Sequence, residues 1–422
     1  MKVRNTILIL IFCLLMLSPA TLWVLDRAQV ALPGWLTSED ATYLSGGIEE
    51  SHLEDTLSLS GFASEEFQAA LETELDNNTP LRADILLANA TLQRDAIASS
   101  NMLFQFDAYP TFYGSGTVYI PAANALATMP TTNERLFKKI TQTVDGIASI
   151  AALYPNKNFY LVVADMSDTS QANPASKLVT GALSTNDFID VMEASLVDTP
   201  NVHIVSIPYT EASDYYQNYY RSDHHWNGFG TLKLYDKLLD VANLPYQPDE
   251  SSLGTLDFGV FPTNGSYARD GLMLINEPAS EPQFDMAGLS VQNEELAPVD
   301  MADGVSVMKS RGLMAEFNFY TQWYGSSLLT DQSPIVNEMS PTSRNAVVIM
   351  DSYADSLHWL LAKNYSYLRC YRDIRAGQKG DASLIERIED TEADDIYFVG
   401  SALAYARIPK CFPHYFNQED AS

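Results

Sequence analysis

The chain alternates between short apolar runs and longer segments with helical periodicity. Apolar residues at 136, 140, 144, 147 and 151 recur every three or four positions and predict an amphipathic helix. Thr131 and Glu134 are spaced as a capping box at its start. Short apolar runs suited to buried strands lie at 159–163, 202–205, 346–350, 367–371 and 396–399. This alternation predicts an α/β fold, with helices on both faces of a mostly parallel sheet.

Further periodic segments divide the chain into regions. Helices are expected at 65–75, 81–97, 188–196, 232–242, 357–361 and 383–388. This pattern predicts a helical lead-in over residues 26–110 and the main domain over residues 111–422. Between about 246 and 345 the pattern weakens, while Gly, Pro and Asn become frequent. We expect an inserted lobe there.

The first 25 residues are typical of an export or membrane segment. Lys2 and Arg4 precede an uncharged apolar stretch at 6–25. Its length is close to the roughly 20 residues that a membrane-spanning helix needs. Ser18-Pro19-Ala20 suits a cleavage site, whereas Trp23 suits the interface end of a retained helix. We expect a retained membrane anchor. Whether the segment is cleaved or retained, the residues after it lie outside the cytoplasm, because the basic residues Lys2 and Arg4 stay on the cytoplasmic side.

Composition narrows the classes of function. The 422 residues include 25 Lys and Arg against 54 Asp and Glu, a formal charge of −29. With 46% hydrophobic residues the chain can bury a core, so disorder is excluded for its bulk. Nucleic-acid binding is excluded because no basic surface is available to neutralise phosphates. Cys370 and Cys411 are the two cysteines beyond the apolar stretch. In an exported protein we expect them to form a disulfide, with two free thiols as the alternative.

The first candidate for chemistry is the stretch 222–228, Ser-Asp-His-His-Trp-Asn-Gly. It contains two of the six histidines and precedes a predicted helix. In an extended segment Asp223 and His225 point to the same side. A carboxylate beside an imidazole fixes its tautomer and stabilises the imidazolium, as a general base requires. The alternative is a structural turn, in which Asp223 caps the helix and the histidines pack on it.

The second candidate is Ser352, which directly follows the apolar run 346–350 and precedes a predicted helix. An α/β fold places such a residue at the carboxyl edge of its sheet, close to backbone N–H groups that stabilise anions. A nucleophile there has oxyanion donors nearby. The alternative is that Asp351 or Ser352 only caps the helix.

Together these stretches resemble a known family. Residues 219–226, Tyr-Tyr-Arg-Ser-Asp-His-His-Trp, resemble the signature of the bacterial DHHW protein family. That family is similar to the SGNH-hydrolase-like proteins of alginate and other exopolysaccharide O-acetylation, which pair an Asp-x-His-Trp motif with a later Gly-[Asp/Thr]-Ser-[Tyr/Phe] motif. Asp223, His225 and Ser352 match in that order. The stretches 261–267 and 323–326 resemble further family segments, whereas Met350 replaces a small or basic residue.

The resemblance implies an SGNH-hydrolase-like three-layer fold and serine-dependent acyl transfer without a cofactor or metal. Asp223 would orient His225, and His225 would deprotonate Ser352. Gly325 and Ser326 are candidates for the oxyanion hole. The implied partners are a polysaccharide acceptor and a polytopic membrane acyltransferase that supplies the acetyl group.

The aromatic residues around the motif have two interpretations. We favour packing under the loop for Trp226 and a structural role for His224. Sugar stacking is the alternative, which makes Trp226 and Tyr353 candidate substrate-binding residues. The aromatic-rich stretch 215–220 likewise suits a carbohydrate groove or ordinary half-buried surface.

Three other functions remain open from the sequence. A non-catalytic polysaccharide-binding or scaffold protein would keep the fold without the reaction. Plain ester hydrolysis needs the same three side chains and differs only in the acceptor. A metal-dependent hydrolase would use His224, His225 and carboxylates, but adjacent histidines rarely reach one ion.

Overall fold

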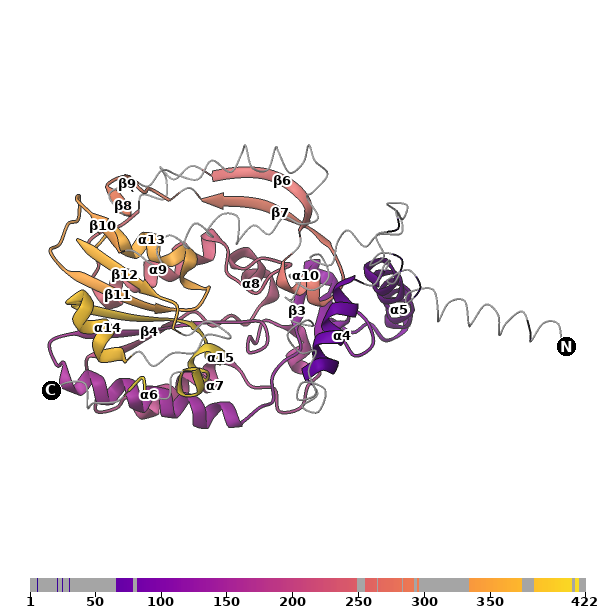
Figure 1. The fold of residues 1–422 in the computed structure, drawn as a ribbon, viewed down its shortest axis with the longest axis horizontal. Helices are drawn as coiled ribbons and strands as arrows, with labels where there is room; N and C mark the ends of the chain where they lie inside the picture. Colours follow the sequence, from indigo (N-terminus) through magenta and orange to yellow (C-terminus); the bar gives the residue numbers. More distant parts are fainter. Residues whose placement is uncertain are drawn as a thin grey trace. The chain divides into compact units, whose positions relative to one another are not determined.

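The computed structural model describes residues 6, 21, 25, 30, 66–78, 82–248, 255–263, 265–282, 284–291, 294–295, 334–373, 383–411 and 414–416 (Figure 1). The predicted N-terminal membrane segment lies almost wholly outside these residues. Among the helices of the described part, none combines the length and the apolar character that crossing a membrane requires. The membrane anchor therefore stays a prediction.

The chain divides into two compact units. The first comprises residues 1–105, 110–115 and 269–273. It contains α4 (Glu66–Asn78) and α5 (Arg82–Phe104), where the helical lead-in was predicted. Within it, Arg94 Nη2 donates to the Leu272 carbonyl at 2.7 Å, which joins the 269–273 segment to α5. The second unit comprises residues 106–109, 116–268 and 274–422 and holds every candidate site residue that the structure describes.

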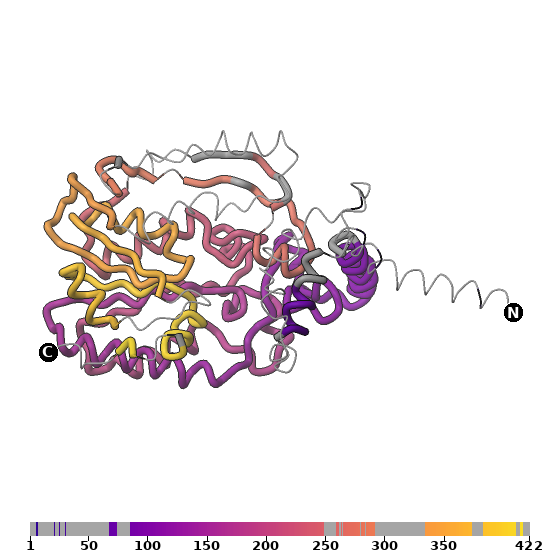
Figure 2. Tube along the Cα trace, viewed as in Figure 1, coloured from indigo at the N-terminus to yellow at the C-terminus, as the bar shows by residue number. Residues whose placement is uncertain are grey.

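An eight-stranded sheet forms the centre of the second unit, in the order β5-β4-β13-β11-β12-β10-β8-β9. Its first five strands are parallel: β5 (Val202–Ser206), β4 (Asn158–Ala164), β13 (Asp395–Ser401), β11 (Asn345–Met350) and β12 (Tyr367–Tyr371). Figure 2 shows β4, from the middle of the chain, beside the yellow C-terminal strand β13. All five apolar runs predicted as strands are strands, and their carboxyl ends meet at one edge.

Helices cover both faces of this sheet, as predicted (Figure 1). Leu234 and Tyr235 of α9 (Gly228–Ala242) and Leu357 of α13 (Ala354–Ala362) pack in one core cluster with Val348 and Met350 of β11. The opposite cluster joins Val347 and Ile349 to the helices α6 (Arg135–Leu153), α7 (Thr185–Ser195), α14 (Leu384–Thr391) and α15 (Ala402–Tyr405). Alternate residues of β11 therefore face opposite cores, which makes a three-layer α/β architecture.

The segment expected as an inserted lobe contributes in part to the main sheet. Within it, β8 (Leu289–Val291), β9 (Glu294–Glu295) and β10 (Ile335–Asn337) extend the sheet, and β10 pairs antiparallel with β12. The same segment holds a separate hairpin of β6 (Thr255–Thr263) and β7 (Ile275–Pro282), with α10 (Ser266–Asp270) between them. The periodicity of segment 246–345 is weak because β8, β9 and β10 are only two or three residues long and lie at the edge of the sheet.

The remaining elements are short. A three-stranded sheet has the order β1-β2-β3, from β1 (Tyr109–Pro110), β2 (Thr117–Ile120) and β3 (Ala125–Thr128). The 3-10 helices η2 (Pro121–Ala123) and η3 (Pro174–Lys177) and the helices α8 (Ala212–Asn218) and α16 (Ile408–Cys411) complete the described elements.

The capping box predicted for α6 is wrong. The N-cap residue is Glu134, in a helical conformation and without a side-chain cap. Thr131 lies too far upstream: its backbone N–H and C=O bond to Asp168 and Leu183 in neighbouring loops. Its hydroxyl accepts from the Asn133 N–H at 3.4 Å. Tertiary pairing of Thr131 therefore overrides the local capping signal.

Candidate active site

Ser352 lies at the carboxyl edge of the parallel sheet. Strand β11 ends at Met350, and α13 begins at Ala354, so Ser352 sits in the tight turn between them. The Asp351 N–H donates to the Val399 carbonyl at 3.1 Å, which extends the strand pairing by one residue. The Asp351 carboxylate accepts the Tyr353 N–H at 2.9 Å. The turn is thus fixed on both sides of Ser352.

Asp223 and His225 lie in the loop between α8 and α9, which we call the histidine loop (residues 219–227). A β-bridge between Tyr219 and Trp226 closes this loop, and the Tyr220 N–H donates to the His225 carbonyl at 3.2 Å. Asn227 ends it as the N-cap of α9, accepting from the Gly230 N–H at 2.9 Å. The predicted cap role therefore belongs to Asn227, which leaves the Asp223 side chain available to His225.

The structure brings the three predicted side chains into one hydrogen-bonded chain. His225 Nδ1 lies 2.6 Å from Asp223 Oδ1, and His225 Nε2 lies 2.7 Å from Ser352 Oγ. Asp223 and His225 are 4% and 6% exposed, so both are shielded from bulk water. A serine hydroxyl that donates to an imidazole, itself oriented by a buried carboxylate, has the geometry of an activated nucleophile.

The Asp223 carboxylate is held in its ionised form. Burial alone would raise its pKa, but the imidazoles of His224 and His225 and hydrogen bonds from His225 and Ser266 hold that pKa well below its usual range. Its second oxygen accepts the Ser266 N–H at 2.8 Å, and the His225 N–H donates to the first at 3.1 Å. An ionised carboxylate at this position favours the proton on His225 Nδ1, which leaves Nε2 to accept from Ser352.

His224 lies beside this chain of hydrogen bonds rather than within it. Its Nδ1 is 2.7 Å from Ser266 Oγ, and its ring centroid is 3.8 Å from that of His225. Its carbonyl accepts the Tyr353 hydroxyl at 2.7 Å. These contacts tie α10 and the serine turn to the histidine loop, in agreement with the structural role expected for His224.

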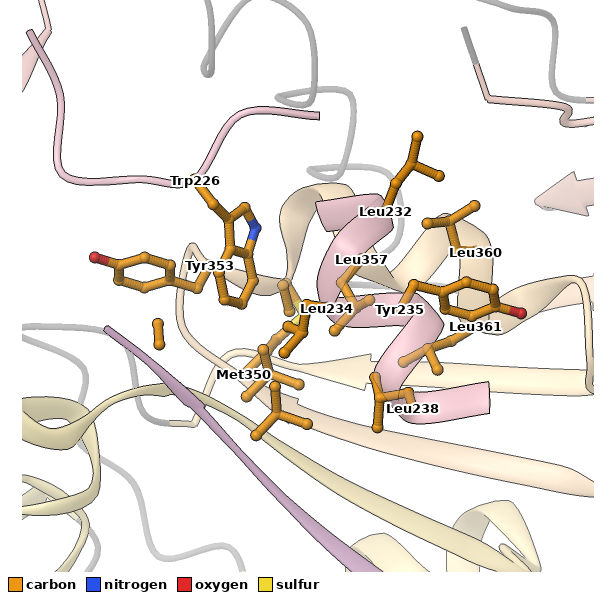
Figure 3. Close-up of a cluster of buried hydrophobic side chains, with 14 of the residues drawn as sticks. Trp226, Leu232, Leu234, Tyr235, Leu238, Met350, Tyr353, Leu357, Leu360 and Leu361 are labelled. Atoms are coloured by element: carbon orange, nitrogen blue, oxygen red, sulfur yellow. The ribbon is translucent and has the colours of Figure 1, made fainter. Parts of the chain in front are cut away.

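Trp226 and Tyr353 are packed beneath the site. They are 3% and 2% exposed, and their rings meet edge to face at 5.1 Å. The Trp226 indole N–H donates to Ser356 Oγ at 2.9 Å. Figure 3 shows both rings beside Met350 in the core between β11 and α9. This burial supports the packing interpretation of Trp226, and the side chain of Met350 occupies the core.

Two acidic residues that hold the histidine loop could not be recognised from the sequence. Glu277 and Glu281, four positions apart on β7, are 3% and 1% exposed. Glu277 accepts from Ser222 Oγ and Thr263 Oγ1, and from the Arg221 N–H at 2.6 Å. We call Glu277 and Glu281 the carboxylate clamp.

Glu281 completes the clamp at the two ends of the loop. It accepts the Tyr220 hydroxyl at 2.5 Å and the Gly228 N–H at 2.8 Å. Burial raises the pKa of Glu277, although hydrogen bonds from Ser222, Thr263 and Arg221 oppose that shift. The clamp lies in the segment of weakest periodicity, so nothing in the local pattern marks its residues as buried.

A close backbone approach beneath Asp223 requires glycine. A Cβ added at Gly265 would collide with the Ser222 carbonyl and lie 2.7 Å from the Asp223 Cβ. Gly265 thereby lets Ser266 donate its N–H to Asp223. The stretch 261–267 was singled out by resemblance only, and its place against the histidine loop gives a physical reason for its glycine.

Asp223, His224 and His225 also offer three potential metal-ligand atoms within 4.8 Å of one another. The donor set is poorly suited to an ion, because both ring nitrogens of His225 are within hydrogen-bond distance of Asp223 and Ser352. Coordination by His225 would break one of those contacts. The arrangement fits proton transfer better than coordination.

The residues predicted for the oxyanion hole and for a disulfide are not placed together by the described part of the structure. Gly325 and Ser326, expected in the oxyanion hole, lie outside the described residues. Cys370 is buried in β12, and Cys411 ends α16. The disulfide between them stays a prediction, as does the oxyanion hole.

Comparison with solved structures identifies the fold. Bacillus cereus PatB1 with a sulfonyl adduct gives a TM-score of 0.50 at 14% identity, covering 70% of this chain and 97% of that one. A DHHW family protein from Eubacterium siraeum DSM 15702 gives 0.47 at 14% identity, covering 72% and 97%. The O-acetyltransferase domain of Pseudomonas putida AlgJ gives 0.34 at 11% identity, covering 67% and 90%. No protein-family model and no curated protein sequence matches the chain.

The chain therefore shares its overall fold with PatB1. Its structural neighbours include a protein of the DHHW family, which the sequence resembles, and an O-acetyltransferase domain.

Proposed function

We propose that this protein transfers an acyl group, with acetyl as the expected case, to a polysaccharide hydroxyl through a covalent intermediate on Ser352. The observation that carries this proposal is the hydrogen-bonded chain in which His225 lies 2.6 Å from Asp223 and 2.7 Å from Ser352. A non-catalytic scaffold has no need of this geometry between one loop and one turn that are far apart in the chain. The contacts therefore support an enzyme.

The reaction has two stages. His225 Nε2 takes the proton from Ser352 Oγ while that oxygen attacks the ester carbonyl, and the resulting imidazolium is stabilised by Asp223. The leaving alcohol takes the proton from His225, and the acyl group stays on Ser352. A sugar hydroxyl then gives its proton to His225 Nε2 while its oxygen attacks the acyl-serine carbonyl. The bond to Ser352 Oγ breaks, His225 returns the proton to that oxygen, and the acetylated sugar leaves.

The oxyanion formed in each stage needs donors. Backbone N–H groups at Ser352, in the turn that leads into α13, are the donors that we propose, together with Gly325 and Ser326. Transfer to a sugar rather than to water requires the acceptor to exclude water from the acyl-serine. An acceptor seated over a site whose imidazole and carboxylate are already buried would achieve this exclusion.

The substrate and the location rest on the resemblance and on the N-terminal sequence. The AlgJ neighbour is described as an O-acetyltransferase domain, which supports acetyl transfer as the reaction class. The basic, then apolar, N-terminus supports a place outside the cytoplasm, anchored in the membrane. A polytopic membrane acyltransferase is the proposed source of the acetyl group.

Trapping of the serine tests the proposal. The exported part would be treated with a sulfonyl fluoride or a fluorophosphonate, and the adduct located by peptide mass spectrometry. We expect an adduct on Ser352 in the wild type and none in Ser352→Ala or His225→Ala. Ser149→Ala, on the exposed side of α6, is the matched control and should label normally. Absence of an adduct on folded wild-type protein would favour the scaffold function.

A second measurement separates transfer from hydrolysis. An isotopically labelled acetyl ester would be supplied with and without an oligosaccharide acceptor. We expect label on the sugar, dependent on Ser352. Free acetate as the sole product, in the presence of saturating acceptor, would identify an esterase instead.

A further inference from the structure

A pocket of about 230 Å³ lies beside the carboxylate clamp, away from the reacting serine. Its lining includes Tyr219, Tyr220 and Arg221 at one end of the histidine loop and Asn227 at the other. Ser352 and His225 do not line it. Drug-sized ligands occupy roughly 300–1,000 Å³, so this pocket suits a single small ring.

The pocket has the chemistry of a site that is ready for a polar ligand. Gln217, Arg221 and Ser280 line it, and their side chains make no hydrogen bond or ion pair with other described residues. The unpaired Arg221 guanidinium is notable in a chain with twice as many acids as bases. Gln217 is exposed, and Arg221 and Ser280 are half-buried, so their polar groups face water and have donors and acceptors to offer a ligand.

The floor and rim of the pocket differ in character. Glu277 and Glu281 form part of the floor and fix the position of the loop through the clamp contacts. Phe229, in the first turn of α9, is 37% exposed at the pocket. A ring with an apolar face and several hydroxyls matches this combination, because the face packs on Phe229 while hydroxyls reach the polar side chains.

We propose that this pocket binds one sugar ring of the polysaccharide, as a subsite separate from the ring that is acylated. The inference rests on the proposed function for the identity of the ligand, since a polymer extends past the reacting residue and needs further contacts to be held. A ring bound here would touch both ends of the histidine loop. It would thereby position the acceptor chain relative to the loop that carries His225.

The experiment measures sugar binding without chemistry. In the Ser352→Ala protein, saturation-transfer NMR and calorimetry would follow three hexasaccharides, derived from cellulose, chitin and polygalacturonate. We expect at least one to bind. Adding Phe229→Ala or Arg221→Gln should raise its dissociation constant about tenfold or more, as loss of one good contact does. Val241→Ala is the matched control, because Val241 lies on the same helix and is also 37% exposed. It should leave the dissociation constant unchanged.

Each outcome decides the subsite independently of the reaction. The subsite is overturned if no hexasaccharide binds. It is also overturned if neither Phe229→Ala nor Arg221→Gln changes the dissociation constant. If the subsite is overturned while Ser352 still reacts with the fluorophosphonate, the proposed function is kept and only the subsite is rejected. If Ser352 is unreactive but binding depends on Phe229 and Arg221, the subsite stands and the proposed function falls. Stronger binding of the acidic hexasaccharide that is lost in Arg221→Gln would assign a carboxylate to that side chain.

Discussion

His225 Nε2 and Ser352 Oγ are 2.7 Å apart although 127 positions separate them in the chain. The contact depends on two independent placements. Strand β11 delivers Ser352 to the carboxyl edge of the sheet, and the bridge between Tyr219 and Trp226 folds the histidine loop toward that edge. Because both placements rest on backbone hydrogen bonds, the pair is formed before any substrate arrives.

Asp223→Asn tests whether the carboxylate sets the tautomer of His225. Asparagine fits the same space but carries no charge to favour the proton on Nδ1. We expect the rate of fluorophosphonate labelling at Ser352 to fall about 10³–10⁴-fold while the protein stays folded. His224→Gln is the comparison, because His224 lies outside the hydrogen-bonded chain, and it should reduce the rate far less. Similar losses in both variants would contradict the assigned roles.

A chelator tests the metal alternative. Both ring nitrogens of His225 have partners in Asp223 and Ser352, so an ion bound there would disrupt the nucleophile. We expect labelling of Ser352 and acetyl transfer to be unchanged after treatment with EDTA and dialysis. Loss of activity that zinc restores would instead identify the Asp223, His224 and His225 group as a metal site.

The sequence predicted the layers of the fold because they depend on periodicity. The run 396–399 became β13 (Asp395–Ser401), and the run 346–350 became β11 (Asn345–Met350). Motif spacing and resemblance marked Asp223, His225 and Ser352, which the structure brings within hydrogen-bond distance of one another. Glu277 and Glu281 could not be predicted, because their contacts with the histidine loop and with Gly228 join residues more than 50 positions apart. Short edge strands such as β10 carry too few residues for a pattern to appear.

Glu281→Ala tests the carboxylate clamp. The substitution removes the acceptor of the buried Tyr220 hydroxyl and of the Gly228 N–H. Leaving buried donors without this acceptor should lower the free energy of unfolding by about 2–5 kcal/mol. The loop that carries His225 should also shift, so labelling of Ser352 should slow by about ten- to a hundredfold. Urea denaturation and labelling kinetics measure the two effects.

Glu193→Ala, on the exposed side of α7, is the matched control for the loss of a glutamate. It should change neither quantity. If Glu281→Ala lowers stability but leaves labelling at the wild-type rate, the clamp supports the fold without positioning His225.

Gly265→Ala tests the close approach beneath Asp223. The added methyl group would collide with the Ser222 carbonyl, so either the loop or α10 must move. We expect a loss of about 1–3 kcal/mol in the free energy of unfolding, typical of overpacking, and slower labelling of Ser352. Gly116→Ala is the control, because a Cβ there meets nothing within 4 Å. Equal behaviour of the two variants would show that the loop adapts freely.

The pH dependence of stability tests the environment of Asp351. Burial raises its pKa to about 6 from 3.8, against the opposing hydrogen bond from Tyr353. The folded protein therefore holds this proton more tightly than the unfolded chain does. Below about pH 4 both states are protonated, and the full contribution to stability is present. As the pH rises through 6 the folded state must ionise a buried group, and about 3 kcal/mol is lost.

Asp351→Asn removes this loss, because the amide stays neutral and still accepts the Tyr353 N–H. The free energy of unfolding of Asp351→Asn minus that of wild type should therefore increase between pH 4.5 and pH 8, as measured by urea denaturation. Asp145→Asn on the exposed side of α6 controls for the loss of a surface charge. A difference that is constant with pH would mean that Asp351 ionises as easily in the folded protein as in the unfolded chain. Its carboxylate would then be a charged neighbour of Ser352 at neutral pH.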